Sequence, residues 1–424
     1  MAQGNIPEKL SQKQVGDAAA RHEMLYAGRM GGARAVFTFM DLSGLDLSGR
    51  NLSDADFTGA VLEETNFSAA RLDSASFFGA DLRRANLTQA SLRRADLRGV
   101  CLRGANLVGA DLYEADLREG AIAEKDKYGN LRVRKHDLGP AELPAALLTS
   151  ANLSRAKMHG VFAQQADFSD AMMKDCRLTR ANLRQARLVG ANLENADLTG
   201  CNLTGALLTG AVLVGTRLDA TVLDGADLNQ TLTSAPAGHQ PSSASLEEML
   251  DAHVRWVETD GLEGKPADLT GVDMRKLGSL GARHLTALIA PGATLYGLDL
   301  EGSSLQGSNL QGADLRSTRL VGVDLRGVNL VGAKLNHADL RDAKLGPLLI
   351  ADDRLLPARL DDVIARYADF RGSDLRRARL TGGDFSYANF SDAHMRDTDT
   401  RSADLTGARL PMFFHQMGMA ERAV

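Results

Sequence analysis

The chain has 424 residues and mixed charge, with 49 Lys and Arg against 54 Asp and Glu and a formal net charge of −5. This length is long for one compact core and predicts several domains or an elongated repeat. The charge balance excludes the polyanionic surface of an evident DNA mimic. The three cysteines form no CxxC motif, and no stretch approaches 18 consecutive apolar residues, so we expect a soluble cytoplasmic protein with reduced cysteines.

The first expected element is an amphipathic helix over residues 8–27. Its apolar residues include Val15, Ala19 and Leu25, and Gly28 provides a stop signal. Such a helix can lie across the open end of a repeat structure and cover its backbone groups and apolar interior. We therefore predict a capping helix.

A five-residue period begins at residue 35 and is clear in ANLTQASLRRADLRG, residues 85–99. Every fifth residue is Leu, with Ala two places before it and most often Asp or Asn directly before it. A small and a large apolar residue two places apart point to the same side of an extended backbone. Asp and Asn tolerate tight turns and hydrogen-bond the local backbone. Five residues therefore make one side of a coil that is filled by Leu and Ala.

The aromatic residues indicate how many sides make one coil. Phe37, Phe57 and Phe77 recur at a spacing of 20, as do Phe370 and Phe390. Four sides per coil would place these rings directly above one another, at about the 4.8 Å spacing of paired strands. We therefore expect four sides.

The pattern appears twice along the chain. A Pro- and Ser-rich linker, residues 233–245, precedes a second amphipathic helix over 245–260 with a capping box from Ser245 to Glu248. His22 and His253 occupy matching places before the two arrays, where we expect packing or hydrogen-bonding roles rather than metal binding. The expected organisation is residues 1–34, N-terminal helix and entry; 35–232, first solenoid with an inserted loop at 123–147; 233–266, linker and second capping helix; 267–410, second solenoid with an inserted loop at 346–365; and 411–424, an apolar C-terminal tail.

The tandem A(D/N)LXX units resemble the pentapeptide-repeat family, as ADLRRANL, ANLVGADL and ANLENADL illustrate. The resemblance implies an all-β solenoid, a right-handed quadrilateral β-helix, here as two tandem units that each follow an amphipathic helix. In the quinolone-resistance members of the family, loops that project from the solenoid engage a type II topoisomerase. This chain is similar in having loops, but it is doubled and has no continuous acidic face.

No motif in the sequence indicates an enzyme. The Asp and Asn residues follow turn geometry, and the glycines form neither a phosphate-binding loop nor a dinucleotide fingerprint. No second His or Cys lies at metal-ligand spacing from His22 or His253. We expect no catalytic residue, no cofactor and no metal site.

Arginines follow the Leu of several repeats in the first solenoid. With four sides per coil, Arg83 stacks on Arg103 and Arg98 on Arg118. One interpretation is a solvated face that is neutralised by Asp81, Asp96, Asp116, Glu114 and Glu119. The other is a surface for an anionic partner, whether an acidic protein, a nucleic acid or lipid head groups. The candidate partner-binding face consists of Arg83, Arg93, Arg98, Arg103 and Arg118.

The C-terminal tail is more apolar than a free tail should be. It either folds over its own last coil or packs against a second copy, and the resemblance favours a homodimer because family members often dimerise through this end. The candidate cap or dimer contacts are Met412, Phe413, Phe414 and Met417.

The function that the sequence favours is a non-enzymatic scaffold that binds another macromolecule, most simply a protein, along its flank and loops. The alternative is a DNA-mimic-type regulator of a type II topoisomerase. A weaker alternative is a binder of nucleic acid or membrane surfaces through the arginine columns.

Overall fold

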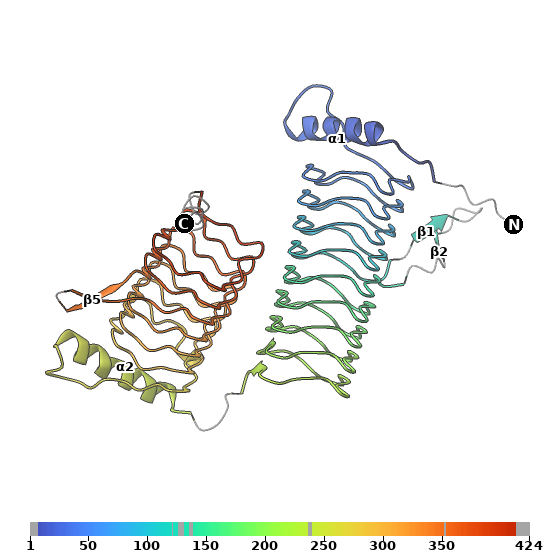
Figure 1. Cartoon of the computed structure of the whole chain (residues 1–424). Coiled ribbons are helices and arrows are strands. Elements are labelled where there is room, and N and C mark those ends of the chain that lie inside the picture. Colours follow the sequence, from blue (N-terminus) through green and yellow to red (C-terminus); the bar gives the residue numbers. More distant parts are fainter. Residues whose placement is uncertain are drawn as a thin grey trace. The chain divides into compact units, whose positions relative to one another are not determined.

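The computed structural model describes residues 7–120, 122–125, 131–134, 139–235, 240–351 and 353–412. It divides into two compact units, Met1–Ala235 (unit 1) and Pro236–Val424 (unit 2). Unit 1 contains α1 (Gln12–Tyr26), β1 (Ile122–Lys125), β2 (Leu131–Arg134), β3 (Val212–Leu213) and β4 (Leu232–Thr233) (Figure 1). Unit 2 contains α2 (Ser243–Glu258), the 3₁₀ turn η1 (Arg275–Leu277), β5 (Leu348–Ala351) and β6 (Arg354–Leu356).

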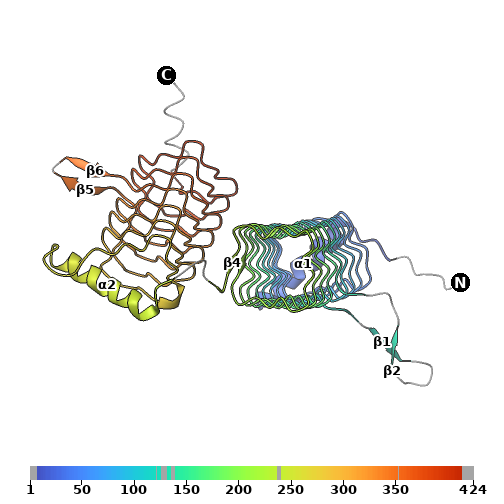
Figure 2. The ribbon, with the colours of Figure 1, turned by 90° about the horizontal axis from the view of Figure 1, so that it is seen from below.

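Each unit is a solenoid of coils joined by parallel bridges, most of them between residues 20 apart. Val36 pairs with Asp56, and Asp56 pairs with Ser76 in the next coil. Four pentapeptides therefore make one coil, and Figure 2 shows the coils of unit 1 superimposed end-on. Across the two insertions, Cys101 pairs with Glu142 and Asn329 with Arg359, so the coils continue beyond each loop.

The corners of the coils are tight turns. The N–H of Ala55 donates to the carbonyl of Leu52 at 3.1 Å, and Asp54 between them has a φ of 59°. A positive φ at the third residue is what a type II turn requires. The Asp or Asn before each central residue completes the corner, as where Asp41 Oδ1 accepts from the N–H of Ser43 at 2.8 Å. The turn role that the sequence predicts for these residues is confirmed.

The central Leu and the preceding small residue fill the interior of both solenoids. Leu97 and Leu198 are 1% and 0% exposed, and each unit has one continuous apolar core. The expected stacks of Phe side chains are present within this core. The rings of Phe57 and Phe77 lie 4.8 Å apart, as do those of Phe370 and Phe390.

Helix α1 lies across the first coil of unit 1 (Figure 1). Its side chains bond to backbone groups of that coil: His22 Nδ1 accepts from the N–H of Ala35 at 3.0 Å, and His22 Nε2 lies 2.9 Å from the carbonyl oxygen of Ser53. Gln12 Oε1 accepts from the N–H of Asp46 at 2.8 Å. Polar groups at the coil edge are thereby satisfied, which a bare edge cannot achieve.

The predicted helix 8–27 is too long at its N-terminus. Ser11 is the N-cap, and a capping box joins it to Gln14. Upstream, the N–H of Leu10 donates to the carbonyl of Asp41 at 2.9 Å, and Lys9 forms a parallel bridge with Asp41. These residues are extended because they pair with the edge of the first coil.

Helix α2 makes the same kind of junction in unit 2. His253 Nδ1 accepts from the N–H of Ala267 at 3.1 Å, and Oε1 of Gln240, just before the helix, accepts from the N–H of Asp273 at 2.9 Å. The predicted capping box of Ser245 and Glu248 is wrong. Ser242 is the N-cap, and its hydroxyl accepts from the N–H of Ser245, which already lies in the first turn.

Both insertions are shorter than the sequence predicts. Leu143 lies inside the predicted loop 123–147, and Leu360 and Ala365 lie inside the predicted loop 346–365, yet all three are buried in the solenoid cores. Leu148, which directly follows the first predicted loop, is buried as well, so four central residues were not recognised as such. The residues that precede them are Glu142, Leu147, Arg359 and Ile364. The turn-forming Asp or Asn is missing there, so these repeats do not show the usual signature.

Candidate functional site

The five predicted arginines do not share one face. The bridge register places Arg83 and Arg103 on one side of the coils and Arg98 and Arg118 on another, while Arg93 lies on a third. The predicted stacking within each pair agrees with this register. A partner that lies flat on one side of unit 1 therefore meets at most two of them.

Each of these arginines is already paired with a carboxylate. Arg98 Nε and Nη2 donate to the two oxygens of Asp96 at 2.8 and 2.7 Å, and its own N–H donates to Asp96 at 3.2 Å. Arg83 and Arg118 repeat this arrangement with Asp81 and Asp116. Arg93 pairs with Asp111 at 2.8 Å, and Arg103 with Glu142 at 3.1 Å.

This pairing supports a neutralised, solvated surface, with two changes to the predicted partners. Glu114 pairs with Arg155 at 3.6 Å, and Glu119 forms no ion pair within the described ranges. Burial alone would raise the pKa of the Asp116 carboxyl, but the bonds from Arg118 outweigh it and hold that pKa below its usual value.

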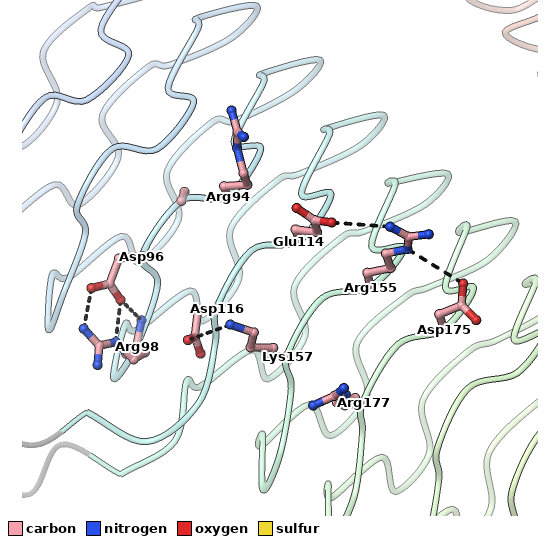
Figure 3. A pocket seen from close by; sticks show the side chains of 10 residues that line it. Arg94, Asp96, Arg98, Glu114, Asp116, Arg155, Lys157, Asp175 and Arg177 are labelled. Carbon is pink, nitrogen blue, oxygen red and sulfur yellow. Dashed lines mark hydrogen bonds and ion pairs between the residues drawn. The ribbon is translucent and has the colours of Figure 1, made fainter.

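A charged groove of about 670 Å³ runs over one corner of unit 1, beside the first insertion (Figure 3). We call it groove 1. Successive coils supply its side chains in register, from the turn positions and from the bridge positions. Its charged lining residues are Arg94, Asp96, Arg98, Glu114, Asp116, Arg155, Lys157, Asp175 and Arg177.

Most charges of groove 1 pair with one another. Arg155 lies between Glu114 and Asp175, at 3.6 and 4.0 Å, and Lys157 lies 3.8 Å from Asp116 (Figure 3). Arg94 and Arg177 make no ion pair in the part of the chain that the structure describes. Groove 1 therefore carries charges of both signs in alternation and is not a strongly basic site.

A second charged groove, of about 390 Å³, lies in unit 2 where the second insertion leaves the coil at Gly346 and Pro347. We call it groove 2. Its charged lining residues are Arg326, Asp374, Arg376, Arg377, Arg396 and Asp397.

Two kinds of arginine line groove 2. Arg376 is held by Asp374 at 2.7 Å, and this hydrogen bond lowers the pKa of the Asp374 carboxyl. Arg377 and Arg396 share the single carboxylate of Asp397, at 3.7 and 3.9 Å, and their side chains are 58% and 79% exposed. These two guanidinium groups are loosely held and accessible.

The hairpin of β5 and β6 begins directly at groove 2. It is antiparallel, and Leu348 pairs with Leu356 at its base. Gly327, at a corner of the coil with a φ of 69°, lies under this pair: a Cβ atom there would be 2.8 Å from Leu348 Cβ and 3.1 Å from Leu356 Cδ2. The absence of a side chain at Gly327 lets the hairpin base sit on the solenoid.

Beyond its base, the hairpin has several apolar and exposed side chains. Leu349, Ile350 and Leu355 are 62%, 45% and 42% exposed, and β5 projects from the side of unit 2 in Figures 1 and 2. Clustered exposed apolar side chains mark contact sites. The sequence signal for this site is the run LLIA followed by RLL, which the sequence analysis places within the inserted loop 346–365 without assigning it a role. The arginines of groove 2 were missed.

The remaining site predictions have separate outcomes. His22 and His253 are buried, burial lowers the pKa of each imidazole, and both bond to backbone N–H groups. The described ranges hold no group of three or more His, Cys, Asp or Glu side chains that would bind a metal. Within the same ranges, no helix has the length and apolar character to cross a bilayer.

The predicted C-terminal contact falls almost entirely outside the described residues. Met412 is 88% exposed, whereas Phe413, Phe414 and Met417 lie beyond the last described residue. The cap or dimer contact therefore stays a prediction.

The sequence matches the family profile described as pentapeptide repeats over residues 33–120, 146–231, 308–346 and 358–411. These segments cover more than half of the chain and lie within the coils of both units. No curated protein sequence matches the chain.

Several solved structures are similar to the chain. A pentapeptide-repeat protein, Rfr23, from the cyanobacterium Cyanothece 51142 is 27% identical over 31% of this chain and 90% of its own, with a TM-score of 0.23. HetL from Nostoc sp. strain PCC 7120 is 20% identical over 93% of this chain and 95% of its own, with a TM-score of 0.14. A trypsin-treated form of QnrB1, a plasmid-mediated fluoroquinolone resistance protein, is 20% identical over 47% of this chain and 87% of its own. Its TM-score is 0.25. At these scores the superpositions carry no argument about the site.

Proposed function

The chain belongs to the pentapeptide-repeat family, whose members form right-handed β-helices, and on this premise we propose that it is a non-enzymatic scaffold that binds a macromolecular partner. The proposed binding surface is the β5–β6 hairpin and the flank of unit 2 beside it. We also propose that the protein acts in the cytoplasm, as its cysteine usage predicts. Helices α1 and α2 are proposed to act as caps of the two solenoids.

The observation that carries this proposal is the exposed apolar hairpin. Leu349, Ile350 and Leu355 face solvent, while Leu348 and Leu356 fix the hairpin to the corner at Gly327. An apolar surface on a fixed support loses little conformational freedom on binding, which favours affinity. The many buried repeats of the solenoid supply that support.

The alternatives have less support. A DNA-mimic-type regulator of a type II topoisomerase requires a continuous acidic face, whereas groove 1 alternates in sign and groove 2 has four arginines against two aspartates. A binder of anionic surfaces through Arg83, Arg93, Arg98, Arg103 and Arg118 requires accessible positive charge, but local carboxylates pair with each of these residues.

The test is affinity purification from the native cell with the full chain and a Leu349→Ser, Ile350→Ser variant. We expect at least one macromolecule to bind the wild-type protein and to be lost with the variant. A Leu207→Ser, Val222→Ser variant, which changes exposed apolar residues of unit 1, is the matched control and should keep the partner. Equal retention by both variants would contradict the proposal.

A homodimer through the C-terminal residues is part of the proposal. Leu405 and Leu410 in the last coil are only partly buried, and a second copy would cover them in a closed pair. Light scattering of the full chain tests this, and a monomeric mass at micromolar concentration excludes it.

A further inference from the structure

Groove 2 and the hairpin adjoin each other, and together they indicate the chemistry of the partner. Gly346 and Pro347 line the groove and directly precede Leu348 of β5, and Arg326 directly precedes the supporting Gly327. We propose that this combined surface binds a protein segment in which acidic residues stand next to apolar ones. This inference rests on the proposed function and names the partner class of the same site.

The acidic part of the segment follows from the unequal pairing of the arginines. Elsewhere in unit 2, Arg341 and Arg371 are each bonded to the Asp two residues earlier, at 2.7 and 2.6 Å. Among the described residues, Arg377 and Arg396 have only Asp397 as an ion-pair partner, at distances beyond a normal hydrogen bond.

A ligand carboxylate can therefore replace a weak contact at groove 2. Exposed ion pairs contribute little to stability, so Arg377 and Arg396 lose little when they turn to a ligand. The planar guanidinium group binds a carboxylate through two parallel hydrogen bonds, which adds geometric specificity. Arg326 and Arg376 are bonded to Asp324 and Asp374, so we expect the acidic part of the segment to bind Arg377 and Arg396.

The apolar part of the segment follows from the hairpin. Leu349, Ile350 and Leu355 offer aliphatic surface that is removed from water only by an apolar ligand. The described residues of the hairpin and groove 2 include no aromatic ring, and ring stacking is the usual way in which proteins hold single-stranded nucleic acid. The combination therefore favours a protein segment over a nucleic acid.

The test uses a random dodecapeptide library displayed on phage and panned against the full-length chain. We expect the enriched peptides to combine Asp or Glu with Leu, Ile, Val or Phe. Synthetic peptides from the enriched set should bind about tenfold or more weakly to a Leu349→Ser, Ile350→Ser variant and to an Arg377→Gln, Arg396→Gln variant.

Matched controls separate a local effect from loss of fold. Arg217, like Arg377 and Arg396, is exposed and loosely paired, at 3.5 and 3.8 Å from two aspartates, so Arg217→Gln should leave peptide binding unchanged. Thermal unfolding should show that all variants remain folded. A thymidine oligonucleotide is the nucleic-acid probe and should not compete with the peptides.

The outcomes distinguish this inference from the proposed function. Peptides that lose binding with the hairpin variant but lack acidic residues, or that are insensitive to the arginine variant, overturn the inference and leave the proposed function standing. Competition by the oligonucleotide also overturns it. If no enriched peptide depends on the hairpin, both proposals are contradicted.

Discussion

The two units have the same kind of interior, each with its own core, and they differ at their insertions. In unit 1, Leu97 is buried directly behind the Asp96–Arg98 pair, and in unit 2, Leu375 is buried behind the equivalent Asp374–Arg376 pair. At the insertions, β1 and β2 have the sequences IAEK and LRVR, with four charged residues, whereas β5 and β6 have LLIA and RLL, with one. The repeat thus constrains the buried residues of each unit, whereas the insertions on the surface can differ between the two units.

The largest loss of unfolding free energy should come from substitutions in the interior of either unit. Leu97→Ala in unit 1 and Leu375→Ala in unit 2 each leave a cavity among tightly packed side chains and should cost about 2–5 kcal/mol of unfolding free energy. Denaturant unfolding of each variant, followed by circular dichroism, measures the cost. A small loss at one position and a large loss at the other would mean that the two interiors are not equivalent.

The helix–coil junctions should show the next largest effect. His22→Ala removes two contacts to buried backbone groups and should cost about 1–3 kcal/mol. His253→Ala should cost less, because His253 Nδ1 bonds to Ala267 while its Nε2 has no hydrogen-bond partner of ordinary geometry within the described residues. The same unfolding measurement, made at neutral pH, ranks the two variants.

The same histidines predict a pH dependence. Burial lowers the pKa of both imidazoles, so the unfolded chain binds more protons than the folded chain below the ordinary value of about 6.5. The stability that the neutral rings provide is therefore fully present above about pH 6.5 and declines as the pH falls below it. A His22→Ala, His253→Ala variant should lose this dependence, while His159→Ala, a change of an exposed histidine, should keep it. An unchanged dependence in the double variant would show that other groups cause it.

Gly327, on which the base of the hairpin packs, should show a smaller effect on the unfolding free energy. Gly327→Ala places a Cβ atom against Leu348 and Leu356 and should cost about 1 kcal/mol beyond its control, because the hairpin lies at the surface and can shift. Gly332→Ala is that control: its φ of 67° is equally left-handed, but nothing lies within 4 Å of the added atom. Hydrogen exchange in Leu348–Leu356 should increase in the first variant alone. Equal exchange in both would mean that the glycine does not support the hairpin.

The smallest effect should come from the paired arginines. Arg98→Ala in unit 1 and Arg371→Ala in unit 2 each remove an exposed ion pair and should change the unfolding free energy by under about 0.5 kcal/mol. A large loss at either position would mean that the arginine, rather than the Leu beside it, carries the packing.

The sequence predicts the interior better than the surface, for physical reasons. Leu87, Leu92 and Leu97 recur every five residues because each turn of the backbone requires an apolar residue at the same place, and this regularity makes the coil visible. Leu143 and Leu360 escape detection because Glu142 and Arg359 stand where the turn usually has Asp or Asn. The boundaries of the insertions were misplaced for that reason.

The candidate site depends on residues that no local pattern connects. Arg326, Arg377 and Arg396 lie in different coils. They meet because the coil register aligns Arg326 and Arg396 with Arg376, the neighbour of Arg377. The sequence shows arginines in both solenoids. It does not show which of them form close ion pairs, because pairing depends on how side chains from neighbouring coils lie. For the five arginines of unit 1, the sequence left open whether nearby carboxylates neutralise them or a partner binds them, and the structure shows the carboxylate pairs.

Unit 2 is proposed to bind the partner through its hairpin. The most direct test places a benzophenone amino acid at Ile350 or at Arg94 in groove 1, in the full chain and in the native cell, followed by irradiation. We predict a covalent adduct with a macromolecule from position 350 and none from position 94. An adduct from position 94 alone, or equal adducts from both, would contradict the account.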